Sequence, residues 1–175
     1  MIKGLIRLTT LALVVLLAVV AWRLMPLPEP ERTLPPLTGT IDLIEIDKSE
    51  RRMTVFREGT PLRSYDIALG FSPVGDKSRE GDGRTPEGRF RIDRRNPKSK
   101  FHLSLGLDYP HAEDIEHAAA YGFSPGGDIF IHGQPNWFTG IMRGDWTEGC
   151  IAVTNAEMEE LWRVARLGTE VVIRP

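Results

Sequence analysis

The sequence contains a single cysteine, Cys150, among its 175 residues. A lone thiol cannot form a disulfide within the chain, so an internal disulfide framework is excluded. One Cys and four scattered His also fail to make the ligand set of a zinc site. The formal net charge is only −2, which argues against a nucleic-acid partner. Because neither a disulfide nor a zinc site accounts for Cys150, the thiol itself is the feature to explain.

The N-terminal residues have the pattern of an export signal. Lys3 and Arg7 precede an apolar run from Leu8 to Trp22, which Arg23 closes. The basic residues on both sides favour a retained membrane anchor, whereas the small residues before Trp22 favour cleavage of a signal peptide. We therefore expect residues 1–24 to be an anchor or a signal peptide. Either outcome predicts a periplasmic protein, held at the inner membrane or secreted after cleavage.

A proline-rich segment follows. Residues 25–38 contain five prolines, which predict an extended, unpacked linker between membrane and domain. The folded domain is expected over residues 39–175.

Short apolar segments within this domain predict a mostly β fold with little helix. The expected strands cover residues 41–47, 52–57, 62–69, 90–93, 128–132 and 171–173. The first three are separated by short polar turns and predict an antiparallel meander. Residues 96–127 contain no clear period and are expected to form a long irregular segment of functional use.

One helix is expected near the C-terminus. Thr154 and Glu157 have the spacing of a capping box, and an apolar stripe at helical spacing follows. Gly168 is expected to end this helix in the left-handed conformation.

Two residues suggest nucleophilic catalysis. Gly149 permits a tight turn before Cys150, and such a turn can direct backbone N–H groups at one point, as an oxyanion hole requires. His132 lies eighteen positions upstream, at the end of an expected strand, and an imidazole can serve as the base of a thiol. A buried inert thiol and a structural histidine remain the alternatives.

The motifs around these residues resemble those of the L,D-transpeptidase catalytic domain, or YkuD family. The family pattern is His-Gly, a gap, and then Ser/Thr-His-Gly-Cys followed by an apolar residue and Arg or Asn. Here His132-Gly133 is followed, after a gap, by Thr147-Glu148-Gly149-Cys150-Ile151. The resemblance covers roughly residues 41–173. It implies a β-sandwich or barrel with one C-terminal helix, no cofactor, and peptidoglycan stem peptides as partners.

Carried over residue by residue, the resemblance implies a thioester mechanism. Cys150 is then the nucleophile and His132 its base, oriented by the backbone carbonyl of Gly133. Backbone N–H groups around Glu148 and Gly149 would hold the oxyanion.

Two positions depart from the family pattern: Glu148 replaces the usual His, and Ala152 replaces the usual Arg or Asn. The run resembles a YafK-like branch, in which at least one relative is associated with detaching lipoprotein from the wall. The resemblance to the family as a whole still implies L,D-transpeptidation as the expected activity. The alternatives are a hydrolytic L,D-carboxypeptidase or endopeptidase, or an amidase that releases a wall-linked lipoprotein.

Four residues are candidates for substrate contacts. Arg143 is suited to bind a carboxylate, and a solvated Arg is the alternative. Trp146 and Thr147 adjoin Cys150, although Trp146 also suits the core. Tyr109 belongs to the irregular segment, which overlies the cleft in relatives. The histidines and acids of residues 111–117 match no standard metal site, and we expect a solvated loop there.

Two other classes of protein compete with this interpretation. A non-catalytic peptidoglycan-binding module would explain the altered motif as lost activity. A papain-like protease would use the same Cys–His pair, but its Cys precedes its His, whereas here His132 precedes Cys150.

Overall fold

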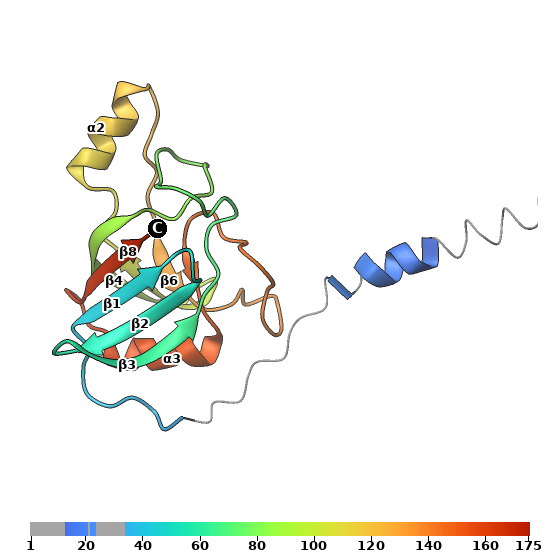
Figure 1. Cartoon of the computed structure of the whole chain (residues 1–175), viewed down its shortest axis with the longest axis horizontal. Coiled ribbons are helices and arrows are strands. Elements are labelled where there is room, and N and C mark those ends of the chain that lie inside the picture. Colours follow the sequence, from blue (N-terminus) through green and yellow to red (C-terminus); the bar gives the residue numbers. More distant parts are fainter. Residues whose placement is uncertain (1–12, 21, 24–33) are drawn as a thin grey trace, which may run out of the picture.

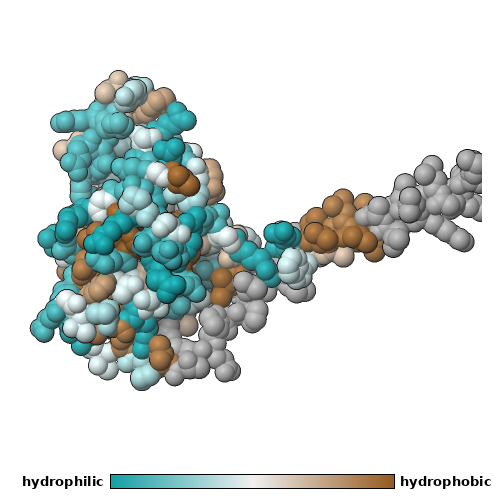
Figure 2. Space-filling view, in the orientation of Figure 1, coloured by the Kyte–Doolittle hydropathy of each residue, from teal (hydrophilic) through white to brown (hydrophobic). Residues whose placement is uncertain are grey.

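The computed structural model describes residues 13–20, 22–23 and 34–175. Residues 13–20 and 22–23 are helical and have exposed apolar side chains (Figure 2). Within the described ranges, no helix has both the length and the apolar character that crossing a membrane requires. Most of the expected linker, and the first twelve residues of the expected signal segment, lie outside these ranges.

Within residues 34–175, eight strands form one continuous sheet, in the order β3-β2-β1-β8-β4-β5-β6-β7 (Figure 1). The strands are β1 (Leu43–Asp47), β2 (Arg52–Arg57), β3 (Thr60–Asp66), β4 (Gly88–Ser99), β5 (His102–Leu107), β6 (Phe130–His132), β7 (Ile151–Ala152) and β8 (Glu170–Arg174). The antiparallel pairing of β1 with β2 and of β2 with β3 confirms the predicted meander. The C-terminal strand β8 lies between β1, which it pairs in parallel, and β4.

The two ends of this sheet approach each other. Ala68, just after β3, exchanges two backbone hydrogen bonds with Ala152 of β7, at 2.9 and 2.8 Å. Thr147 makes a second pair of backbone hydrogen bonds with Leu69 and Phe71. Because β3 and β7 are opposite edges of the strand order, these contacts close the sheet in the manner of a barrel. They also fix the segment that leads into Cys150.

The helix α3 (Asn155–Val164) confirms the predicted C-terminal helix. Thr154 Oγ1 accepts from the backbone N–H of Glu157, and the Glu157 carboxylate accepts from the backbone N–H of Thr154, which is the predicted capping box. The helix packs against β5 and β6. Its predicted end is wrong, because the cap is Ala165. Gly168, at φ +84°, belongs instead to the turn before β8.

The expectation of one long irregular segment over residues 96–127 is also wrong. β4 continues to Ser99, β5 follows, and a second helix, α2 (Ala112–Ala120), stands at the end of the sheet away from α3 (Figure 1). The histidines and acids expected in a solvated loop are therefore on or next to α2.

The described end of the proline-rich segment is packed rather than free. The backbone N–H of Leu37 donates to Glu160 at 3.0 Å, and Arg63 donates to the carbonyl of Pro35 at 2.6 Å. Leu37 also packs against the apolar core. The prediction of an unpacked linker is therefore wrong for residues 35–37.

Candidate active site

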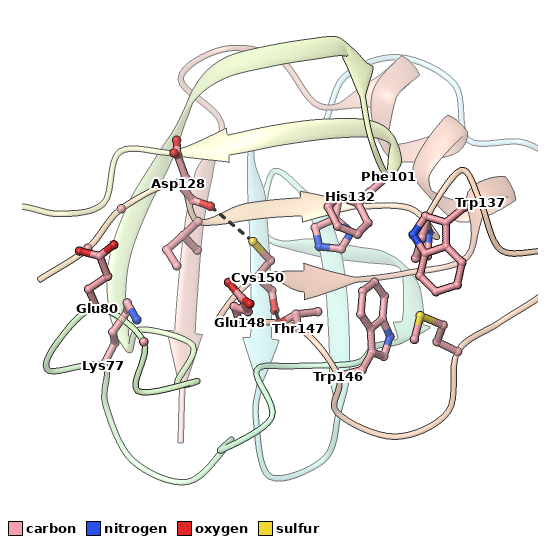
Figure 3. Close-up of a pocket in the computed structure, with 16 residues that line it drawn as sticks. Lys77, Glu80, Phe101, Asp128, His132, Trp137, Trp146, Thr147, Glu148 and Cys150 are labelled. Atoms are coloured by element: carbon pink, nitrogen blue, oxygen red, sulfur yellow. Dashed lines mark hydrogen bonds between the residues drawn. The ribbon is translucent and has the colours of Figure 1, made fainter. Parts of the chain in front are cut away.

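Cys150 and His132 line the same cavity, of about 620 Å³ (Figure 3). Cys150 directly precedes β7, and His132 ends β6, which pairs with β7 in parallel. The parallel pairing explains how residues eighteen positions apart come to line one cavity. The thiol is partly buried and donates to the backbone carbonyl of Asp128 at 3.4 Å.

The turn before Cys150 depends on Gly149. Its φ is +132°, a region that side chains disfavour, and an added Cβ would lie 2.7 Å from the carbonyl oxygen of Arg84. Thr147 is buried and holds this turn: its hydroxyl donates to the carbonyl of Cys150 at 2.7 Å. The tight turn predicted from the sequence is therefore present.

The turn directs its backbone N–H groups differently from the prediction. The N–H of Gly149 donates to the Thr147 hydroxyl at 3.2 Å, so it is used within the turn. The prediction that Gly149 presents this donor to an oxyanion conflicts with this geometry. Thr147, expected as a substrate contact, lines the cavity and also positions the backbone around the thiol.

The imidazole of His132 is fixed by its neighbour. Its Nδ1 lies 2.7 Å from the backbone oxygen of Gly133, and a carbonyl oxygen can only accept a hydrogen bond. Nδ1 therefore carries the hydrogen, which leaves Nε2 as the basic nitrogen. Gly133 cannot be replaced easily, because an added Cβ would lie 2.5 Å from Oδ1 of Asn155.

Two aromatic rings enclose this imidazole. The ring centroid of Phe101 lies 4.6 Å from that of His132, and the centroid of Trp146 lies 5.6 Å away on an edge-to-face approach. His132 is only 3% exposed as a result. Burial lowers the pKa of His132 to about 4, and the hydrogen bond to Gly133 opposes this shift only in part.

The thiol is also desolvated. Burial raises the pKa of Cys150 to about 11; a hydrogen bond from the Phe130 backbone opposes the rise, and the charges of Asp128 and Glu148 add to it. At neutral pH the resting site therefore contains a neutral thiol and a neutral imidazole. Within the described residues no hydrogen bond joins the two side chains, so the resting site holds no preformed thiolate–imidazolium pair.

The structure brings some predicted substrate contacts to the cavity and leaves others outside. Trp146 and Thr147 line it, and so does the exposed Glu148. The indole N–H of Trp146 is buried and, among described groups, has no hydrogen-bond partner. Tyr109 does not line the cavity: it is buried in the core, and its hydroxyl donates to the carbonyl of Pro125. Arg143 is exposed outside the lining, with its guanidinium 5.1 Å from the ring centroid of Trp22.

The sequence prediction missed several residues that line the cavity. Phe101 contacts the imidazole, and the backbone of Asp128 contacts the thiol. Lys77 and Glu80 also line the cavity. Asp128 carries a usable signal, because it directly precedes the expected strand that ends in His132. The others come from distant segments and carry none. The described residues contain no cluster of His, Cys, Asp or Glu suited to hold a metal ion.

Comparison with known proteins places this site in a family context. The family model of the YkuD L,D-transpeptidase catalytic domain matches residues 41–173. YafK of Escherichia coli (strain K12), a protein assigned to the L,D-transpeptidases, is 28% identical over 133 residues, which is 73% of this chain and 48% of YafK. The chain therefore spans about half the length of this curated relative.

Solved structures agree with the fold. The helical cell shape determining protein Pgp2 from Campylobacter jejuni is 26% identical, with a TM-score of 0.61 over 78% of this chain and 48% of Pgp2. Bd1075 from Bdellovibrio bacteriovorus is 25% identical, with a TM-score of 0.55 over 81% of this chain and 53% of Bd1075. An L,D-transpeptidase from Xylanimonas cellulosilytica shares the fold. It is 18% identical, with a TM-score of 0.52 over 81% of this chain and 64% of that protein's chain.

Proposed function

Because the chain belongs to the YkuD family of L,D-transpeptidase catalytic domains, we propose that it is a cysteine acyltransferase of peptidoglycan stem peptides. The observation that carries this proposal is the cavity that Cys150 and His132 share, with the basic Nε2 of His132 left unprotonated. The family acts on peptidoglycan, which supports the substrate class.

The first half-reaction forms a thioester. Substrate binding displaces water, and the proton of the Cys150 thiol passes to Nε2 of His132 as sulfur attacks the peptide carbonyl. The proton then passes from His132 to the leaving amine, and the C–N bond breaks. Because the thiol pKa of about 11 lies far above that of the imidazole, the proton moves only as the new C–S bond forms. The backbone N–H groups of Glu148 and Cys150, rather than that of Gly149, are the proposed donors to the oxyanion.

The second half-reaction removes the acyl group. In transfer, an amine of a second stem peptide attacks the thioester and forms a new amide; in hydrolysis, water attacks and leaves a carboxylate. In both, the Cys150 thiolate leaves and is reprotonated through His132. The indole N–H of Trp146 offers an unused donor beside the cavity for either reaction.

Hydrolysis is the second candidate, and Glu148 favours it. Its exposed carboxylate lines the cavity at the position where the family pattern has His. A carboxylate there can accept a proton from an attacking water. The products would be shortened stem peptides or a released wall-linked lipoprotein.

Location and biological role follow the same proposal. The basic and apolar N-terminal residues support export to the periplasm. Cell fractionation distinguishes a membrane-attached protein from one released by cleavage. The likeness to Pgp2, a protein that determines helical cell shape, supports an effect on cell shape.

The decisive test incubates the full chain, solubilised in detergent, with purified peptidoglycan and analyses the fragments by mass spectrometry. New cross-links between stem peptides indicate transfer, and shortened stems or released protein indicate hydrolysis. Cys150→Ala is expected to abolish every product while it retains the wild-type unfolding temperature. Products that persist in this variant, or no product from the wild type, would favour a non-catalytic wall-binding module.

Glu148 separates the two reactions. Glu148→His is expected to raise the ratio of transfer to hydrolysis, and Glu148→Gln to lower hydrolysis without creating the family residue. Unchanged ratios in both variants would exclude a role for Glu148 in the choice.

A further inference from the structure

A second pocket, of about 470 Å³, lies next to the catalytic cavity. One wall is the loop between β3 and β4, and the other is the end of α2 with the residues that follow it. Gly81 lines both the pocket and the cavity, so the two are adjacent along the surface. The surface over α2 and beneath it is mainly hydrophilic (Figure 2). Its lining includes Ser72, Ser78, Arg79, Asp82, Arg84 and Phe123.

The single carboxylate in this lining belongs to Asp82 and is fully used. Its Oδ1 accepts from Lys77 Nζ at 2.8 Å and from the backbone of Arg84, and its Oδ2 accepts from the backbones of Ser78 and Arg79. Burial works against ionisation, but these hydrogen bonds outweigh it and lower the pKa of Asp82 to about 2. The charge of Asp82 is balanced by the buried ammonium of Lys77.

Asp82 is therefore not the counter-charge of the two guanidinium groups in the lining. Arg79 lies over the ring of Phe123, 4.9 Å from its centroid, and Arg84 donates to the backbone carbonyl of Asp76 at 3.1 Å. In the part of the chain that the structure describes, neither forms an ion pair with a carboxylate. These contacts orient both cations at the pocket without neutralising them.

The charge reverses on the other side of Gly81. The catalytic cavity is lined there by the carboxylates of Glu80 and Glu148, and by Asp128, whose carboxylate pairs with Arg94 at 3.2 Å. Its one cation, Lys77, is the group already paired with Asp82. A bound molecule that crosses Gly81 is therefore oriented with its anionic part at the arginines and its cationic part near the thiol.

We propose that this pocket is a carboxylate subsite, in which Arg79 and Arg84 bind an acidic group of the wall peptide whose scissile amide lies at Cys150. A planar guanidinium pairs with a carboxylate through two parallel hydrogen bonds, and two guanidinium groups fix its direction as well as its place. The hydroxyls of Ser72 and Ser78 add neutral donors in the same pocket. The subsite rests on the proposed function for its substrate, but not for its affinity toward carboxylates.

The test measures binding in the absence of chemistry. The full chain carrying Cys150→Ala is titrated with a disaccharide tetrapeptide that has free carboxyl groups, and with the same compound in which these groups are amidated. Adding Arg79→Gln and Arg84→Gln together is expected to weaken binding of the free-acid compound roughly ten- to hundredfold. The amidated compound is expected to bind weakly to both proteins, with no further loss from the arginine substitutions.

Arg89→Gln is the matched control, because Arg89 is exposed and lies in neither lining. It is expected to leave both affinities unchanged, and equal unfolding temperatures are required of all variants. Equal affinity of the free-acid compound for the parent and the double arginine variant would overturn the subsite. Equal losses for the free-acid and amidated compounds would overturn it as well.

The outcome is separable from that of the proposed function. Arginine-dependent binding of the free acid supports the subsite even if the wild type turns over no peptidoglycan. Turnover by the wild type, with unchanged binding and an unchanged KM in the arginine variants, overturns the subsite and leaves the enzyme assignment intact.

Discussion

His132 illustrates how single residues set the chemistry of this site. Its neighbour Gly133 fixes the tautomer, but its acidity is set by the rings of Phe101 and Trp146, which exclude water from the imidazole. A buried imidazolium loses its hydration, so the neutral base is favoured down to about pH 4. The imidazole therefore stays neutral and able to accept a proton across the physiological pH range, and the thiol stays protonated.

Phe101→Ala is expected to raise the pKa of His132 from about 4 toward the ordinary value near 6.5. The reason is that water gains access to the ring that Phe101 covers. An NMR titration of the imidazole resonances in the folded protein measures the shift directly. Phe101→Leu keeps an apolar cover and is expected to leave the pKa near the wild-type value. Identical titrations of the alanine variant and the wild type would contradict this account.

The same shift affects stability with a definite sign. Between pH 6.5 and pH 4, His132 is protonated in the unfolded chain but neutral in the folded chain. The free energy of unfolding therefore falls as the pH falls. The contribution is roughly 3 kcal/mol over this window. Above pH 6.5 His132 is neutral in both states and contributes no pH dependence.

Among the elements, the loop between β3 and β4 supplies one wall of both pockets. It is held from within by Lys48, which is 2% exposed. The ammonium donates to the carbonyls of Gly75 and Thr85, at 2.6 and 2.9 Å, and to the carboxylate of Glu87 at 2.7 Å. One buried cation thus gives a glycine-rich segment a fixed path over the site.

Lys48→Met is expected to loosen this loop. It leaves a partly buried carboxylate and two carbonyls without their donor, at a cost of about 3 kcal/mol in the free energy of unfolding. Hydrogen exchange should increase over residues 75–87 more than in the sheet. Lys98→Met, at an exposed lysine, is the control and is expected to change neither quantity. Uniform exchange changes, or none in the loop, would be inconsistent with this role.

On the scale of the whole molecule, Glu160 of α3 joins three parts of the chain. Its carboxylate is 0% exposed and accepts from Arg63 and Tyr65 of β3, at 2.7 and 2.9 Å, and from the backbone of Leu37. The helix, the edge strand and the segment before the domain therefore depend on one charge. Such a buried pair specifies an arrangement more than it adds stability, but removing one partner leaves the other uncompensated.

Glu160→Gln is expected to lower the free energy of unfolding by roughly 3–5 kcal/mol, because Arg63 stays buried without a counter-charge. Urea denaturation of the full chain measures it. The adjacent Glu159 is half exposed and, within the described residues, pairs only with His102, so Glu159→Gln is a control expected to cost less than about 1 kcal/mol. Similar losses in both variants would show that burial of the charge is not the cause.

Short-range patterns in the sequence determine part of this structure. The capping box of Thr154 and Glu157 depends on residues three apart, and the meander depends on alternation within single strands. The link between His132 and Gly133 also lies within one dipeptide, and the turn at Gly149 within one short run, so these features were predictable. Local contacts of this kind are present in the sequence itself.

Tertiary structure decided what depends on distant partners. β5 is stabilised by pairing with β4, where Gly106 packs so closely against Arg94 that an added Cβ would clash. No period in the sequence carries that information. The path of the chain likewise placed Tyr109 in the core and brought Phe101 onto His132. The sequence alone thus indicated a thiol and its base. Only the packing of separate segments removes water from both groups and places cavity and neighbouring pocket, with their opposite charges, side by side.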